Sequence, residues 1–183
     1  MSTFLTPANQ LTLLRLLLVP VFVICTLYNM PGWALIVFAS AGVTDLFDGL
    51  VARLSGQSTE LGAWLDPMAD KLLLLSMFIM LTIPTAGQAN RLPIWLTVLV
   101  ISRDVGIVMT VAVVNLAVGP RTFRPSIFGK AATAIYVVTG VVTLYYNYLR
   151  VSSPVVRGFV YLALAITLIS GFDYVRRSTR SLP

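Results

Sequence analysis

Residues 45–71 read DLFDGLVARLSGQSTELGAWLDPMADK and contain four regularly spaced aspartates, which are Asp45, Asp48, Asp66 and Asp70. The first two are three residues apart and the last two are four apart, so on helices each pair lies on one face. The connection between the pairs, residues 53–62, is short and predicts two antiparallel neighbouring helices. Both pairs of carboxylates are therefore expected to point into one shared pocket.

The residue types in this pocket favour a hard divalent cation. The chain has no histidine, so a metal would be held by oxygen, which favours Mg²⁺, Mn²⁺ or Ca²⁺. Two such ions about 4 Å apart would clamp a phosphoryl group during an in-line displacement. The other interpretation is a structural charge network, in which the acids pair with Arg15, Arg53, Lys71 or Arg103.

The composition around this stretch is that of a membrane protein. Of the 183 residues, 57% are hydrophobic and 11% are charged, which is too little charge to cover a water-soluble domain of this size. Apolar segments long enough to cross a core of about 30 Å recur along the chain, separated by proline, glycine and serine. We expect an all-α fold, an integral membrane bundle of six transmembrane helices in one domain (1–183), with spans at about 9–29, 33–53, 62–84, 91–118, 128–149 and 154–176.

The basic residues predict the orientation of this bundle. Cations gather in cytoplasmic loops and at lipid headgroups, so the net charge of +6 is interpreted as membrane contact and no nucleic-acid partner is expected. Six spans would place both termini on the same side of the membrane. That side would hold seven basic residues, which are Arg53, Arg121, Arg124, Lys130, Arg176, Arg177 and Arg180. The opposite side holds three, which are Arg91, Arg150 and Arg157. We therefore expect both termini and the aspartates to face the cytoplasm.

Read as one string, the stretch carries the pattern Asp45-x2-Asp48-Gly49-x2-Ala52-Arg53-x8-Gly62-x3-Asp66-x3-Asp70. This pattern resembles the signature of the CDP-alcohol phosphatidyltransferases, with all eight defining positions matched at the expected spacing. The first span is similar to the common opening of that family, and Lys71 directly follows the last aspartate. The matching residues of the first span are Asn9, Thr12, Arg15 and Pro20.

The resemblance implies a reaction, its cofactors and its site residues. The reaction is transfer of the phosphatidyl group from CDP-diacylglycerol to a glycerol-type alcohol, with release of CMP, in phospholipid biosynthesis. Two divalent cations, Mg²⁺ or Mn²⁺, would be bound by Asp45, Asp48, Asp66 and Asp70. The CDP moiety would be bound by Gly49, Ala52, Arg53 and Gly62. Asp70 would also be the catalytic base for the acceptor hydroxyl, a role that the spacing alone does not assign among the four acids.

The resemblance further implies a homodimer in contact with membrane lipids. We expect it to be integral to a bacterial inner membrane, with the active site facing the cytoplasm.

The acceptor alcohol is predicted from the second half of the chain. Arg103 lies within the fourth span, and Arg121, Arg124 and Lys130 follow it; these four suit a phosphate-bearing acceptor. The alternatives are pairing of Arg103 with Asp104 or a motif acid, and an ordinary positive-inside bias for the other three.

Two branches of the family remain open for the acceptor. Enzymes that use glycerol 3-phosphate usually show Arg-Glu where this chain has Arg103-Asp104. The run Arg124-Pro125-Ser126-x2-Gly129-Lys130-x2-Thr133 is more similar to the cardiolipin synthases, whose acceptor is phosphatidylglycerol, although Tyr136 replaces a common glutamine. The sequence thus places phosphatidylglycerol slightly ahead of glycerol 3-phosphate, with inositol phosphate and serine behind both.

Two other classes of protein compete with the enzyme. A small helical transporter would also bury acids that carry cations, but this chain shows no repeat, and its acids lie at the ends of spans. A purely structural membrane subunit is the remaining alternative.

Overall fold

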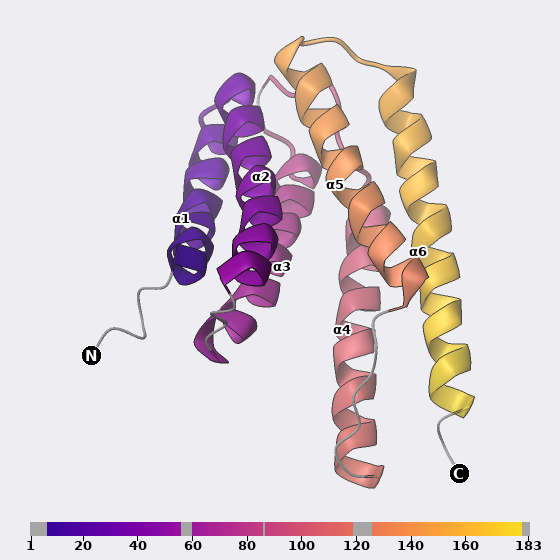
Figure 1. Ribbon diagram of the computed structural model, residues 1–183. Coiled ribbons are helices and arrows are strands. Elements are labelled where there is room, and N and C mark those ends of the chain that lie inside the picture. The colour runs from indigo at the N-terminus through magenta and orange to yellow at the C-terminus, as the bar shows by residue number, and fades with distance from the viewer. Residues whose placement is uncertain (1–6, 56–59, 86, 119–125, 181–183) are drawn as a thin grey trace. The chain divides into compact units, whose positions relative to one another are not determined.

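The computed structural model describes residues 7–55, 60–85, 87–118 and 126–180, and its regular elements within these ranges are six α-helices (Figure 1). They are α1 (Pro7–Leu27), α2 (Pro31–Ser55), α3 (Glu60–Thr82), α4 (Ile94–Val118), α5 (Ile127–Tyr148) and α6 (Pro154–Arg180). Pro31 and Pro154 begin their helices at the position where the missing N–H has no partner to lose. The prediction of an all-α fold is confirmed.

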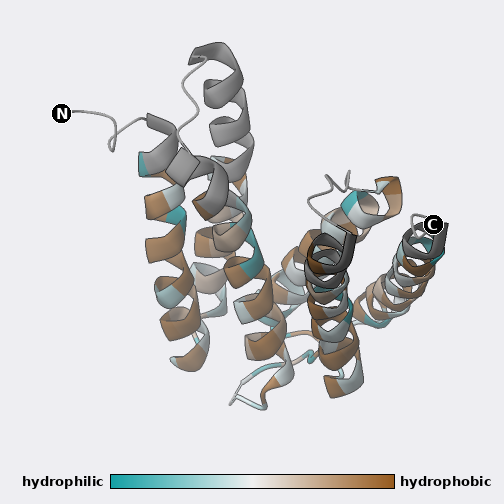
Figure 2. Ribbon diagram, turned by 90° about the horizontal axis from the view of Figure 1, so that it is seen from below, coloured by the Kyte–Doolittle hydropathy of each residue, from teal (hydrophilic) through white to brown (hydrophobic). Residues whose placement is uncertain are grey.

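Three of these helices are long and apolar enough to cross a membrane, judged over the described residues. They are α1 over Gln10–Leu27, α5 over Ile127–Tyr148 and α6 over Pro154–Arg176. Within the described residues, α2 has a shorter apolar stretch, Pro31–Thr44. Figure 2 shows that apolar residues predominate along the described helices, with polar residues scattered among them. A membrane protein is therefore supported, and the span count of six stays a prediction.

The chain divides into two compact units. The first, which we call the motif unit, comprises residues 1–91 and 140–152; the second, which we call the basic unit, comprises residues 92–139 and 153–183. Helix α5 belongs to both, because it passes from the basic unit into the motif unit at Gly140.

In the motif unit, α1 packs against both α2 and α3. The rings of Phe22 and Phe38 meet with their centroids 5.6 Å apart across the α1–α2 contact. The three helices lie alongside one another and alternate in direction (Figure 1), which confirms the predicted antiparallel course of α2 and α3. Gly140 lets α5 approach Met77 of α3, since an added Cβ would lie 2.6 Å from the Met77 Cε.

The end of the motif unit away from the aspartates is fixed by an amide pair. Asn147 accepts a hydrogen bond from the Asn90 backbone N–H (2.7 Å) and donates through Nδ2 to the Asn90 carbonyl (3.1 Å). The Asn90 side chain in turn donates to the Val151 carbonyl at 2.8 Å. Both asparagines are buried, so these bonds hold the α3–α4 connection against the end of α5 away from bulk water.

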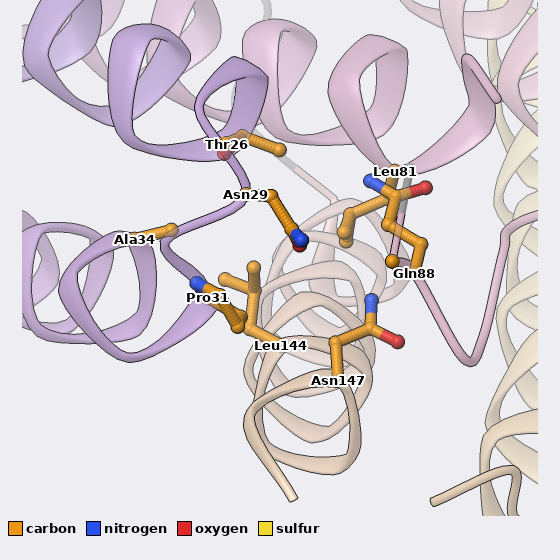
Figure 3. Close-up of a pocket in the computed structure, with 9 residues that line it drawn as sticks. Thr26, Asn29, Pro31, Ala34, Leu81, Gln88, Leu144 and Asn147 are labelled. Atoms are coloured by element: carbon orange, nitrogen blue, oxygen red, sulfur yellow. The ribbon is translucent and has the colours of Figure 1, made fainter. Parts of the chain in front are cut away.

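Beside this pair lies a small cavity of about 10 Å³, which Thr26, Asn29, Leu144 and Asn147 help to line (Figure 3). That volume suits about one water molecule. Gly87 closes it with a φ of +80°, and an added Cβ there would lie 2.3 Å from the Asn29 Nδ2.

Replacing Gly87 by alanine is expected to lower the free energy of unfolding by about 1 to 3 kcal/mol, because the left-handed backbone and the contact with Asn29 both oppose a side chain. Thermal unfolding in detergent measures the loss. The control is Gly158→Ala in α6, where an added Cβ meets nothing within 4 Å and helix propensity favours alanine. Equal melting temperatures for the two variants would contradict this prediction.

Candidate functional site

The structure places the motif aspartates on the two helices that the spacing predicted. Asp45 and Asp48 lie in the last part of α2, and Asp66 and Asp70 lie in the first part of α3. Only residues 56–59 separate the two helices, so the ends that carry the aspartates are close along the chain. Most of the predicted motif side chains lie outside the described residues, namely those of Asp45, Asp48, Gly49, Ala52, Arg53, Gly62 and Asp66. Their shared pocket stays a prediction.

Asp70 is the motif aspartate whose side chain the structure describes. Its Oδ1 accepts a hydrogen bond from Nη1 of Arg15 in α1 at 2.5 Å. The Arg15 side chain is fully buried, whereas that of Asp70 is 40% exposed. This contact selects one of the pairings that the charge-network interpretation left open. It is also compatible with a metal ligand, because a carboxylate can accept several contacts at once.

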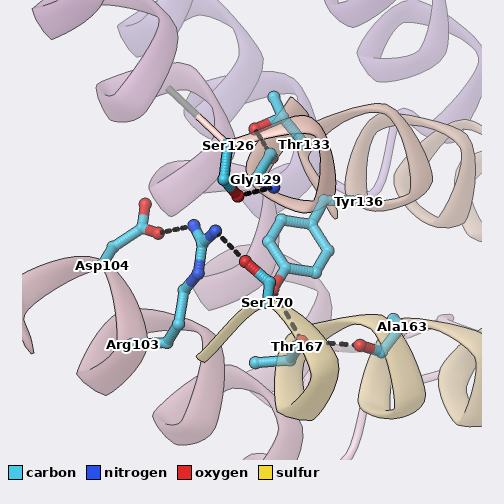
Figure 4. Close-up of polar contacts among 9 residues, drawn as sticks. All are labelled: Arg103, Asp104, Ser126, Gly129, Thr133, Tyr136, Ala163, Thr167 and Ser170. Carbon is cyan, nitrogen blue, oxygen red and sulfur yellow. Dashed lines mark hydrogen bonds and ion pairs between the residues drawn. The ribbon is translucent and has the colours of Figure 1, made fainter. Parts of the chain in front are cut away.

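In the basic unit, Arg103 of α4 is held by two side chains (Figure 4). Its Nη1 donates to Asp104 at 2.7 Å, and its Nη2 donates to the Ser170 hydroxyl of α6. Only 12% of the Arg103 side chain is exposed. Pairing with Asp104, the alternative that the sequence left open, is thereby confirmed. It leaves the guanidinium compensated within an apolar helix.

The first turn of α5 lies next to this guanidinium. Ser126 caps the turn, since its Oγ accepts the Gly129 N–H at 2.9 Å. A Cβ on Gly129 would lie 3.4 Å from the Arg103 Nη2, so glycine keeps this approach open. Lys130 follows and is exposed. Two of the predicted acceptor residues thus lie on adjoining elements of one unit, whereas Arg121 and Arg124 lie outside the described residues.

The sequence reasoning missed a row of hydroxyl groups that joins the helices of this unit. The Tyr136 hydroxyl pairs with the Thr167 hydroxyl at 2.6 Å, and Thr167 donates to the Ala163 carbonyl (Figure 4). Farther along α6, Tyr174 donates to the Ile107 carbonyl of α4 at 3.1 Å. The spacing of hydroxyl residues in α6 could have predicted this row. Thr167, Ser170 and Tyr174 are spaced by three and four residues, so they share one face of the helix.

Comparison with known proteins finds a matching family model and several relatives of this chain. The family model of the CDP-alcohol phosphatidyltransferases matches residues 5–169. A relative from Mycobacterium tuberculosis H37Rv named "Probable phosphatidylglycerophosphate synthase" is 40% identical over 96% of this chain and 82% of its own length. The "Cardiolipin synthase (CMP-forming)" of Streptomyces coelicolor is 37% identical over 70% of this chain and 60% of its own length. The human protein of that name is 34% identical over 71% of this chain and 47% of its own length.

The contact between Arg15 and Asp70 is expected to be worth about 1.5 to 3 kcal/mol, the range for hydrogen bonds to charged groups. A double-mutant cycle with Arg15→Met, Asp70→Asn and both together measures it by unfolding in detergent. Arg157→Met, at an exposed position of α6, is the matched control for loss of an arginine. Strictly additive effects of the two substitutions would show that the contact carries no coupling energy.

Proposed function

Because the chain belongs to the CDP-alcohol phosphatidyltransferase family, we propose that it transfers the phosphatidyl group of CDP-diacylglycerol to glycerol 3-phosphate. The observation that carries the reaction is the eight-position motif, which lies on the end of α2 and the start of α3 within the matched residues. The acceptor is supported by the relative named a phosphatidylglycerophosphate synthase, whose alignment covers 96% of this chain.

Phosphatidylglycerol is the second candidate for the acceptor. The run from Arg124 to Thr133 favours it, and the relatives named cardiolipin synthase share 34% to 37% identity with this chain. Their alignments cover only about 70% of the chain, which is why we place glycerol 3-phosphate first and reverse the order that the motifs alone gave.

The proposed setting is a bacterial inner membrane crossed by all six helices. Three helices meet the length and hydropathy of a span, and the excess of basic residues on the side of the termini supports a cytoplasmic position for both ends and for the motif. A homodimer is part of this proposal.

Two divalent cations, Mg²⁺ or Mn²⁺, fit the donor set of the motif, which consists of carboxylates and contains no imidazole. Asp45, Asp48, Asp66 and Asp70 would bind them, and the exposed part of the Asp70 carboxylate is compatible with this role. When bound, such ions neutralise charge on the diphosphate of the donor.

The residues of the chain would then position and deprotonate the acceptor. Asp70 accepts the hydroxyl proton while the acceptor oxygen bonds to the lipid-side phosphorus, and the bond from that phosphorus to the CMP oxygen breaks. Arg15 fixes Oδ1 of Asp70, which limits the orientations that its carboxylate can adopt. Gly49, Ala52, Arg53 and Gly62 would bind the CDP moiety.

The acceptor phosphate is proposed to meet Arg103, Arg121, Arg124 and Lys130. Lys130 is exposed on the first turn of α5, where N–H groups and the helix dipole also favour an anion. Arg103 keeps its contacts with Asp104 and Ser170, so it would meet the acceptor phosphate as part of that ion pair.

The purified protein is expected to release CMP from CDP-diacylglycerol when glycerol 3-phosphate and Mg²⁺ or Mn²⁺ are present, and to stop when EDTA is added. Asp66→Asn is expected to reduce this rate at least about 100-fold, because the substitution removes a charged ligand of the metals. Phosphatidylglycerol, serine and inositol phosphate are supplied in parallel, with the lipid product identified each time. CMP release with phosphatidylglycerol alone would assign the second candidate, and none with any acceptor would favour the transporter.

Lys130→Gln is expected to raise the KM for glycerol 3-phosphate about tenfold, because a charge-assisted contact with phosphate is lost. The KM for CDP-diacylglycerol should stay the same. Steady-state kinetics with each substrate varied in turn measure both constants, and Arg157→Gln is the control for loss of one positive charge. An unchanged KM for the acceptor would remove Lys130 from its site.

A further inference from the structure

A groove lies at the end of the motif unit away from the aspartates, where α1 turns into α2 and α5 ends. It has a volume of about 490 Å³ and is lined by Met30, Pro31, Gly32, Trp33, Ile36, Tyr148 and Arg150. Four large side chains in this lining are about half or more exposed, which are Met30 (50%), Trp33 (63%), Ile36 (55%) and Tyr148 (56%). The groove is therefore an apolar surface that the motif unit itself leaves open.

The residues that line the groove are of three kinds, which are aliphatic, aromatic and cationic. Trp33 and Tyr148 belong to the types that mark the level of lipid headgroups at helix ends, and Ile36 lies one turn farther into α2. Arg150 follows the end of α5 and is the charged residue of the lining. An apolar stretch, an aromatic pair and a cation in that order match the acyl chain, glycerol region and phosphate of a phospholipid.

The backbone at Arg150 supports a specific role for its side chain. Arg150 has a φ of +55° and occupies the left-handed position after α5, where its N–H donates to the Asn147 carbonyl and that of Val151 donates to the Tyr146 carbonyl. Helix α1 ends with the same pair of bonds around Asn29, also at +55°. Glycine and asparagine suit this position, so an arginine here carries a conformational cost of about 1 kcal/mol.

Gly32 shapes the floor of the groove. A Cβ on this residue would lie 3.0 Å from Cδ2 and 3.1 Å from Cε2 of Tyr148. The glycine thus allows the tyrosine ring to lie directly on the first turn of α2, and this contact joins the two helices that line the groove.

We propose that this groove binds an anionic phospholipid, with its phosphate at Arg150, its glycerol region at Trp33 and Tyr148, and an acyl chain along Ile36. The site lies at the opposite end of the motif unit from the reacting groups, in the leaflet opposite the active site. It rests on the membrane-spanning placement given under Proposed function and is independent of the reaction itself.

Quenching of Trp33 fluorescence by brominated lipids tests the groove directly. The full chain with Trp64→Phe and Trp95→Phe retains Trp33 as its single tryptophan, and it is reconstituted with brominated phosphatidylglycerol or brominated phosphatidylcholine at equal mole fraction. We expect Trp33 to report about a fivefold preference for phosphatidylglycerol, the effect of one arginine at a membrane surface. Arg150→Asn should abolish the preference and leave the melting temperature unchanged or higher, because asparagine suits the left-handed backbone.

Matched variants and a soluble competitor distinguish a specific lipid site from diffuse surface charge and from a second copy of the chain. Arg150→Lys should keep most of the preference, and Arg157→Asn, which removes an exposed charge of α6 outside the groove lining, should keep all of it. Soluble glycerol 3-phosphate should not displace the lipid. A preference that persists in Arg150→Asn would overturn the proposal in favour of diffuse surface charge. Absence of quenching by either lipid would overturn it in favour of a second copy covering the groove.

The same preparation distinguishes this inference from the proposed reaction. Asp66→Asn in the single-tryptophan background should lose CMP release and keep the lipid preference. Loss of the preference in that variant would show that the groove depends on the active site and would contradict an independent binding site.

Discussion

A charge buried in an apolar helix bundle must be compensated by a partner within reach of its own side chain, and Arg15 is where this constraint acts most strongly. Its fully buried guanidinium, on the apolar helix α1, meets Asp70 on α3. Because α1 packs against both helices that carry the motif, this ion pair ties the first span to the candidate active site. Helix α1 therefore contacts the candidate site through Arg15.

The same constraint accounts for the contacts of the basic unit. Arg103 lies within an apolar helix and is held by Asp104 and Ser170, and the Tyr136 hydroxyl finds the Thr167 hydroxyl. Each contact satisfies a polar group that lipid cannot hydrate. The arrangement leaves Lys130 exposed on the turn beside Arg103, whereas Arg103 itself is held by structural contacts.

The helices could be predicted because the residues at and between their ends determine where each helix begins and stops. Apolar segments of sufficient length and the breakers between them placed the second helix at about 33–53, against Pro31–Ser55 in the structure. The partner of Asp70 was not predictable, since several basic residues satisfied the same charge rule and only packing chooses Arg15. The Tyr136–Thr167 contact likewise joins residues 31 positions apart, which no local pattern encodes. The shared pocket of the four aspartates remains a prediction.

The amide of Asn147 contacts the backbone N–H and carbonyl of residue 90, groups that nearly every amino acid supplies. The two positions of this pair therefore differ in how well they tolerate substitution. Substitution at position 90 removes the side-chain bonds to the Val151 carbonyl and to the Asn147 Oδ1, but it keeps both backbone bonds to Asn147. Substitution at position 147 instead removes the side-chain partner of a buried N–H and of a buried carbonyl. Among distant homologues, the identity of residue 147 should thus change far more slowly than that of residue 90.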